Sequence, residues 1–238
     1  MASIICRDLC LTIPIFDYSN QSLRQSLVQK AVGGTINTSN SVSTVDALKK
    51  VNLEIVTGDM VGIVGHNGSG KSSFLRVLSG IYSPTSGSCE IDGTLLSIIS
   101  LSDGLEPSLS GRENIYRVGL MRNIPLDFLR EREASIIEFS ELDAFIDLPV
   151  RTYSSGMSLR LVFSVLTAVN CDILVLDEFF AAGDAAFQEK AANRIKEMIG
   201  KAKVFVFASH SFDLIKQHCS RVFVFAKGEV TEENVRNI

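Results

Sequence analysis

The chain has 238 residues, of which 46% are hydrophobic and 21% charged, with a net charge of −4 and a mean hydropathy of +0.23. This length suits one large domain, or a domain with a subdomain, and the composition is typical of a globular protein. The acidic balance excludes the overall basic surface of a nucleic-acid-binding protein. The net charge does not exclude a local basic patch, but we expect no nucleic acid among the partners.

The cysteines and the N-terminus indicate the cellular compartment in which the protein resides. The cysteines are odd in number and scattered, which predicts reduced thiols in a cytosolic protein rather than disulfides or a zinc site: Cys6, Cys10, Cys89, Cys171 and Cys219. The apolar N-terminus carries Arg7 and Asp8, so we do not interpret it as a signal peptide. No run reaches the roughly 18 apolar residues of a membrane span, and we expect a chain that does not cross a bilayer by itself.

The N-terminal part predicts strands separated by a polar insertion. A strand is expected over residues 3–13, and residues 17–46 follow as a polar stretch. Inside it, Leu23, Leu27 and Ala31 fall at helical spacing before Gly33. This possible amphipathic helix fits a surface helix over a sheet edge, or one that docks on a membrane or a partner.

The remaining elements alternate. Strands are expected over 48–56 and 60–65, a helix over 71–80, and a turn-and-strand region up to residue 99. Residues 105–160 are more charged and helical in pattern, and they predict a helical subdomain inserted into an α/β core. After it come, in order, a helix (159–169), a strand (172–178), a helix (185–199), a strand (203–209), a helix (212–219) and a strand (221–230). Such alternation predicts a mainly parallel sheet.

A phosphate-binding loop follows the strand over 60–65. The stretch from Gly65 to Ser72 fits G-x-x-x-x-G-K-[ST] at every fixed position. Glycines allow successive backbone amides to point at one anion, and the following helix adds its positive end. We predict that nucleoside triphosphate is bound by Gly65, His66, Asn67, Gly68, Ser69, Gly70, Lys71, Ser72 and Ser73. Within the set, Lys71 would reach the β and γ phosphates and Ser72 would ligate Mg²⁺.

Two carboxylates end the strand "ILVLDE". In an open α/β sheet, ligands bind at the carboxyl edge of the strands. Asp177 would support the Mg²⁺ shell with Ser72, and Glu178 would orient or deprotonate the attacking water. The alternative, a solvated acidic pair that opens a loop, is less favoured beside a matched phosphate loop.

Three further polar residues lie after that strand or within the loop. Asp184 could cap the next helix, contribute to a subunit contact, or do both. His210 ends the strand "VFVFAS" and could donate a hydrogen bond to the γ-phosphate, although an isolated histidine is more often an ordinary surface or core residue. His66 occupies a variable loop position, and we assign no chemistry to it.

The stretch "RTYSSGMSLRL", Arg151 to Leu161, places two serines and a glycine at the start of an apolar helix. That pattern fits ordinary helix capping, or half of a phosphate site whose other half lies elsewhere.

Together these motifs resemble the ATP-binding subunits of ABC transporters. The phosphate loop, "YSSGM", "ILVLDE" and "SHS" occur in the order of that family, and the resemblance spans residues 48–227. It implies a P-loop α/β fold over residues 1–238, with a mainly parallel core, an antiparallel β region and the inserted helical subdomain. It also implies ATP and Mg²⁺ as ligands and an enzyme that hydrolyses ATP.

The resemblance further implies a site shared between two subunits. A signature formed by Ser154, Ser155, Gly156 and Met157 would face the γ-phosphate held by the other copy. Asp184 would lie in the loop that such dimers bring together. A homodimer would then drive two copies of an integral membrane permease from the cytoplasmic face of the bacterial inner membrane.

The details resemble one branch of the family. "YSSGM", "DEFFAAGDAAF" and "SGREN" (110–114) are similar to proteins that export lipid-linked polysaccharides, such as O-antigen, capsule or teichoic acid. Leu101 stands where many relatives have a glutamine. Phe16, and after it Tyr18, is the candidate aromatic for stacking on adenine.

Alternative functions remain open at this point. The chain could serve an ABC transporter of another substrate. A non-transport ABC ATPase usually has two cassettes or a long coiled-coil insertion, and this chain has one set of motifs. A P-loop kinase would need neither "YSSGM" nor His210.

Overall fold

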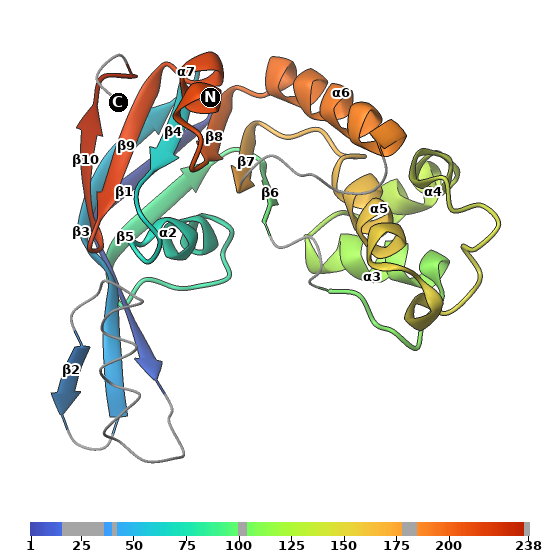
Figure 1. Ribbon diagram of the computed structural model, residues 1–238, viewed down its shortest axis with the longest axis horizontal. Helices are drawn as coiled ribbons and strands as arrows, with labels where there is room; N and C mark the ends of the chain where they lie inside the picture. Colours follow the sequence, from blue (N-terminus) through green and yellow to red (C-terminus); the bar gives the residue numbers. More distant parts are fainter. Residues whose placement is uncertain (16–35, 40–41, 100–103, 178–184, 236–238) are drawn as a thin grey trace. The chain divides into compact units, whose positions relative to one another are not determined.

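The computed structural model describes residues 1–15, 36–39, 42–99, 104–177 and 185–235 (Figure 1). The chain forms two compact units. Unit 1 comprises Met1–Ile99, Asp172–Glu178 and Lys203–Ile238, and unit 2 comprises Ser100–Cys171 and Phe179–Ala202. Unit 2 therefore includes more residues than the segment 105–160 that we expected as a helical subdomain. Within the described ranges, no helix combines the length and the hydropathy that a membrane crossing requires.

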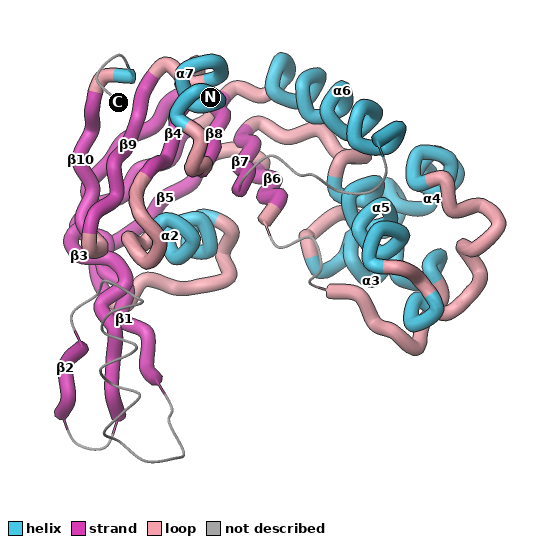
Figure 2. The backbone as a smooth tube through the Cα atoms, in the orientation of Figure 1, coloured by secondary structure: helices cyan, strands magenta, loops and turns pink. Residues whose placement is uncertain are grey.

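Unit 1 contains an antiparallel four-stranded sheet in the order β2-β3-β1-β5 (Figure 2). Its strands are β1 (Ser3–Ile15), β2 (Ile36–Ser39), β3 (Val42–Val56) and β5 (Ser86–Asp92). β1 pairs with β3 on one side and with β5 on the other, so that β5 is an edge strand. β3 begins at residue 42, earlier than the strand expected over 48–56. The expected helix of the insertion lies outside the described residues.

The second sheet of unit 1 has six strands in the order β10-β9-β4-β8-β7-β6. Its strands are β4 (Met60–Val64), β6 (Leu95–Ile98), β7 (Ile173–Asp177), β8 (Val204–Ala208), β9 (Arg221–Ala226) and β10 (Glu229–Glu233). All pairings are parallel except that of β9 with β10. The sequence predicted this mainly parallel core and an antiparallel region beside it.

One expected strand is a hairpin instead. Residues 221–230 read as a single strand, but the chain turns at Lys227 and Gly228, whose φ angles are 51° and 87°. β10 then returns alongside β9. The turn is hard to predict from the sequence, because it directly follows the apolar run "VFVFA" and its first residue is a lysine, which is uncommon at positive φ.

The two sheets and helix α2 (Lys71–Leu78) share one core. Ile4 and Ile55 of the antiparallel sheet, Ile63 and Val206 of the six-stranded sheet, and Phe74 of α2 all belong to one buried cluster. The Phe74 ring packs against the Phe225 ring with centroids 5.2 Å apart. Helix α7 (Phe212–His218) lies over β4, where the Ile215 side chain fills the space beside Gly62. This packing fixes the start of α2 relative to the strand ends.

Unit 2 consists of helices: α3 (Gly111–Met121), α4 (Leu126–Ser140), the short 3-10 helix η1 (Val150–Thr152), α5 (Ser155–Leu166) and α6 (Ala185–Lys201). α5 begins four residues before the helix expected over 159–169. Phe139, Phe163 and Phe187 form a three-ring cluster that joins α4, α5 and α6. Arg194 and Lys190 stack over Phe139, at 4.4 and 4.7 Å from its centroid.

Asn114, in the motif "SGREN", fixes the entrance to α3. Its side chain is fully buried, accepts from the Glu106 amide at 2.8 Å and donates to the carbonyls of Glu106, Leu109 and Ser110. Ser110 caps α3 in a capping box with Glu113. An asparagine supplies both donors and acceptor at this one buried point.

Asn114→Asp is expected to lower the free energy of unfolding by about 3 kcal/mol, because it turns a carboxylate toward three buried carbonyls. Urea unfolding measures the loss. Asn193→Asp, at an exposed position of α6, is the matched control and should change stability by no more than about 0.5 kcal/mol. Equal losses in the two variants would contradict the role of Asn114.

Candidate functional site

The loop between β4 and α2 is enclosed by backbone from two other strands. Gly65 has φ +148°, and a Cβ there would overlap the Phe225 carbonyl of β9. Gly70 has φ +114°, and its Cβ would lie 2.7 Å from the Ala47 carbonyl of β3. Both positions therefore require glycine, since they combine left-handed backbone with close contact to a carbonyl. The confined loop leads directly into the N-terminus of α2, where amides point outward for an anion.

Lys71 is the first residue of α2 and its side chain folds back over the loop. Its Nζ donates to the carbonyls of Gly65 at 2.6 Å and His66 at 3.1 Å, and the residue is only 8% exposed. Ser69 in the same loop has a buried hydroxyl with no hydrogen-bond partner among the described atoms. The loop thus holds a buried cation and an unsatisfied polar group, as expected of a site built for an anionic ligand.

Strand register brings further polar residues to this point. β8 lies between β4 and β7, and Ala208 pairs with both Ile63 and Asp177. Because the three strands are parallel, their carboxyl ends share one edge. Asp177 ends β7, and Ser209 and His210 follow β8 at that edge.

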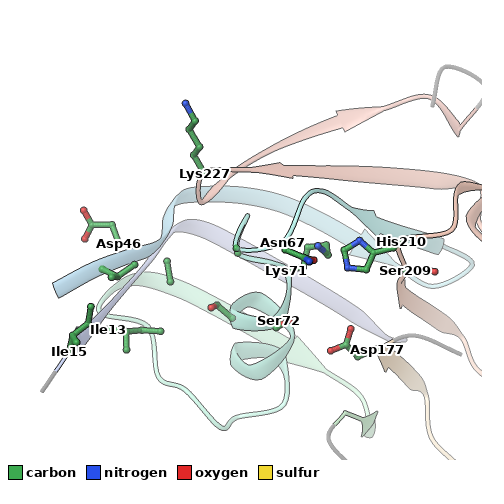
Figure 3. A pocket seen from close by; sticks show the side chains of 15 residues that line it. Ile13, Ile15, Asp46, Asn67, Lys71, Ser72, Asp177, Ser209, His210 and Lys227 are labelled. Carbon is green, nitrogen blue, oxygen red and sulfur yellow. The ribbon is translucent and has the colours of Figure 1, made fainter. Parts of the chain in front are cut away.

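These residues line one cavity of about 500 Å³ (Figure 3). Its polar wall consists of Asn67, Gly68, Gly70, Lys71, Ser72, Ser73, Asp177, Ser209 and His210. In Figure 3, Lys71 and His210 lie on one side of the cavity, and Ser72 and Asp177 lie below them. Oxygen donors, a buried cation and a helix N-terminus together suit a polyphosphate.

The other end of the cavity was not identified from the sequence. Ile13, Ile15, Val45, Ala47 and Asp46 line it, together with Lys227. Antiparallel pairing of β1 and β3 places Ile13 opposite Val45 and Thr12 opposite Asp46. The long polar insertion separates these residues in sequence, so no local pattern relates them to the phosphate loop. The chemistry of this end is apolar, with one charge of each sign beside it.

Some expected residues of the loop do not line this cavity. Gly65 and His66 line a neighbouring cavity of about 400 Å³ with His210, Phe212 and Glu233. The expected base Glu178, the stacking candidates Phe16 and Tyr18, and Asp184 and Leu101 lie outside the described residues.

In unit 2, the serine-glycine stretch starts helix α5. Ser154 is the N-cap, with extended backbone, and its Oγ accepts from the Met157 amide at 3.2 Å. Ser154 and Ser155 are exposed, and Gly156 and Met157 are half-buried. The capping interpretation is therefore correct, and the same helix start presents hydroxyls and amides to solvent.

Tyr153, just before the cap, is held by the helical unit. Its hydroxyl donates to the Phe145 carbonyl at 2.8 Å, and burial raises the pKa of the phenol, with a smaller contribution from Asp147. The hydroxyl also occupies the space where Gly111 would carry a Cβ. Thus the tyrosine of "YSSGM" and the glycine of "SGREN" are in direct contact within the helical unit.

Gly111→Ala is expected to lower the free energy of unfolding by about 2 kcal/mol, because the new methyl group overlaps Tyr153 and lies 3.0 Å from Ile146 atoms. Tyr153→Phe removes the hydroxyl and should cost about 1 kcal/mol by itself. The double variant should recover part of the loss, with a coupling of about 1 kcal/mol in urea unfolding.

Gly200→Ala is the matched control, since Gly200 lies in α6 with open space around it. It should raise stability by up to about 1 kcal/mol. Strict additivity of Gly111→Ala and Tyr153→Phe would refute the contact.

The family model described as "ABC transporter" matches residues 48–181. The O-antigen export system ATP-binding protein RfbE of Yersinia enterocolitica is 44% identical, over 99% of this chain and 99% of its own length.

Relatives in other bacteria are longer. The O-antigen export system ATP-binding protein RfbB of Myxococcus xanthus is 43% identical over 76% of the chain. The teichoic acids export ATP-binding protein TagH of Enterococcus faecalis is 45% identical over 77% of it. In both relatives the match covers 41% of their own length.

A solved dimeric ATP-binding cassette in a post-hydrolysis state, bound to ADP and Pi, matches with TM-score 0.67 over 99% of the chain. It is 21% identical, so this likeness concerns the fold. The family model, the relative that matches over 99% of both chains and the fold all indicate the same family. The chain belongs to the ABC transporter family, as one of its ATP-hydrolysing ATP-binding subunits.

Proposed function

We propose that the chain powers the export of a lipid-linked polysaccharide, similar to O-antigen, by a separate membrane permease. The observation that carries this proposal is the 44% identity to an O-antigen export ATP-binding protein over 99% of both chains. The teichoic acids export relatives support the same class of cargo, a polymer carried on a lipid.

The cavity in unit 1 is where ATP would bind. Its triphosphate would lie at the N-terminus of α2, with Lys71 released from the loop carbonyls to reach the β and γ phosphates. The base and ribose would extend toward Ile13, Val45 and Ala47. Phe16, the sequence candidate for stacking on adenine, follows β1 by one residue and stays a proposal.

Mg²⁺ fits the donors of this cavity. Ser72 and Asp177 supply hydroxyl and carboxylate oxygens, the ligands that Mg²⁺ prefers, with phosphate and water oxygens completing its shell. In the described part of the chain, no three His, Cys, Asp or Glu side chains form a metal cage, which agrees with a metal held largely by substrate. Bound there, Mg²⁺ would neutralise charge on the transferring phosphate.

The chain supplies its own groups for the hydrolytic step. Glu178 directly follows Asp177, and we assign it to orient or deprotonate the attacking water. His210 lies in the same cavity as Lys71, where its imidazole would donate to the γ-phosphate. Both groups would act on the face of the γ-phosphate turned away from the loop.

A second copy would complete the site. The loop and α2 would contact one side of the triphosphate. The exposed start of α5 in a partner would cover the other side with Ser154, Ser155 and Gly156. ATP would then hold a homodimer together, and hydrolysis would release it. Asp184 would lie in the loop near this contact. Such a dimer would drive two permease copies from the cytoplasmic face of the inner membrane.

Ser154→Asp separates capping from phosphate contact. Aspartate is as good an N-cap as serine, so the melting temperature should stay within about 2 °C of wild type. The added charge would face the partner's γ-phosphate, so ATP hydrolysis should fall by about 100-fold or more. Melting curves and phosphate release measure the two effects.

Ser135→Asp is the matched control, because it adds the same charge at an exposed position of α4. It should leave hydrolysis within about twofold of wild type. Normal hydrolysis by Ser154→Asp would rule out the shared site.

Export is tested in the bacterium that carries the gene. Deletion of the gene should remove the polysaccharide from the cell surface and leave its lipid-linked form inside. The wild-type chain should restore export, and Lys71→Ala, produced at equal level, should not, because the phosphates lose their cation. Unchanged surface polysaccharide after deletion, alongside normal ATPase activity of the purified protein, would assign the chain to a transporter of another substrate.

A further inference from the structure

Two thiols face each other where β1 meets the edge strand β5 in unit 1. The thiol of Cys6 donates to the sulfur of Cys89, with the two Sγ atoms 3.2 Å apart. The residues are direct partners in the antiparallel register. Neither of them lines the cavity at the phosphate loop, so the proposed ATP site includes neither thiol.

Direct pairing places the backbones of the two residues within the distance that a disulfide spans. Directly opposed residues of antiparallel strands have Cα atoms about 4.5–5.5 Å apart, inside the range that disulfides span. A disulfide has an S–S length of about 2.05 Å, so the sulfurs need to approach by only about 1.2 Å. Small rotations of the two side chains can supply this distance.

A bulge beside the pair holds β5 against β1. The register shifts between Arg7 and Cys10, directly after Cys6. There Gly87 has φ +75°, and a Cβ on it would overlap the Asp8 carbonyl. The two strands are thus in close contact next to the thiols, which limits how far the sulfurs can separate.

The two thiols differ in access. Cys6 is 3% exposed and belongs to the core cluster with Ile4 and Leu9, whereas Cys89 is partly exposed on the edge strand. The hydrogen bond and burial raise the pKa of Cys6, and the same bond lowers the pKa of Cys89. Cys89 is therefore the reactive thiol, and Cys6 is positioned to resolve it.

We propose that Cys6 and Cys89 form a redox modification site, at which a hydroperoxide links them in a reversible disulfide that joins β5 to β1. The Cys89 thiolate attacks one oxygen of hydrogen peroxide, the O–O bond breaks, and hydroxide leaves and takes up a proton. The product is a sulfenic acid on Cys89. The Cys6 sulfur then attacks the Cys89 sulfur, the S–O bond breaks, and water leaves with the Cys6 proton.

In sum, two thiols and one peroxide give one disulfide and two waters, and a dithiol reductant reverses the change. The link closes the segment from residue 6 to residue 89, which contains the phosphate loop. Closing a segment of this length restricts the unfolded chain and stabilises the folded one. Thiols that are reduced at rest and oxidise under stress agree with a cytosolic protein.

The experiment uses the purified full chain, treated with graded hydrogen peroxide, alkylated and digested with trypsin without reduction. Cys6 and Cys89 fall in the separate peptides 1–7 and 77–112, and Cys10 falls in 8–24. The main product should be 1–7 linked to 77–112, lighter than the sum of its parts by two hydrogen atoms. Titratable thiols should fall from five to three, and dithiothreitol should restore all five.

Variants separate the two roles. Cys6→Ser should leave a Cys89 sulfenic acid that dimedone traps, and Cys89→Ser should give about tenfold less trapping at Cys6. Cys10→Ser is the matched control on the same strand: Cys10 pairs with Ser86, and its variant should keep the link. The oxidised wild type should melt about 5 °C higher than the reduced form, and Cys6→Ser should show no such shift.

Five titratable thiols after peroxide treatment would overturn the proposal. So would links that form equally through Cys10, or an equal melting shift in Cys6→Ser. Thiol count, peptide mass and melting temperature do not depend on ATP hydrolysis, so failure here is distinct from failure of the proposed function.

Discussion

The confinement of the phosphate loop is the constraint on which unit 1 depends. The Phe225 carbonyl of β9 encloses the loop at Gly65, and the Ala47 carbonyl of β3 encloses it at Gly70. The Gly228 amide, in the turn between β9 and β10, donates to the Ser69 carbonyl at 2.9 Å, and the Lys49 amide of β3 donates to the Gly228 carbonyl at 2.8 Å. Both sheets therefore hold the same loop. Contacts from both sheets thus fix the backbone of the loop, and with it the direction of the loop amides.

The turn between β9 and β10, which was not predicted from the sequence, contacts the phosphate loop. Lys227 and Gly228 reverse the chain so that the Gly228 amide meets the phosphate loop, and Lys227 itself lines the cavity. Without the turn, β9 would continue past the loop and leave the Ser69 carbonyl without that partner. The β9–β10 hairpin thus lines the cavity at the phosphate loop as well as forming the sheet edge.

In unit 2 the corresponding constraint is the start of α5. Ser154 caps the helix, and Tyr153 fixes the preceding backbone through Phe145 and Gly111. Because this helix start is held in one conformation, the proposed contact with a phosphate would need little further ordering. The tyrosine of "YSSGM" therefore has a structural role within the helical unit, where it contacts the glycine of "SGREN".

The sequence alone determined those parts of the protein whose chemistry is local. The phosphate loop, the carboxylate at the end of β7, the cap of α5 and the alternation of strands and helices each need a fixed order of neighbouring residues, so each can be identified from a short stretch. Only the tertiary structure decided which distant residues share a site. Ile13 meets Val45 through β-pairing across the polar insertion, and Cys6 meets Cys89 across 83 residues. Register and close approach depend on how whole strands pack, and no local pattern records that packing.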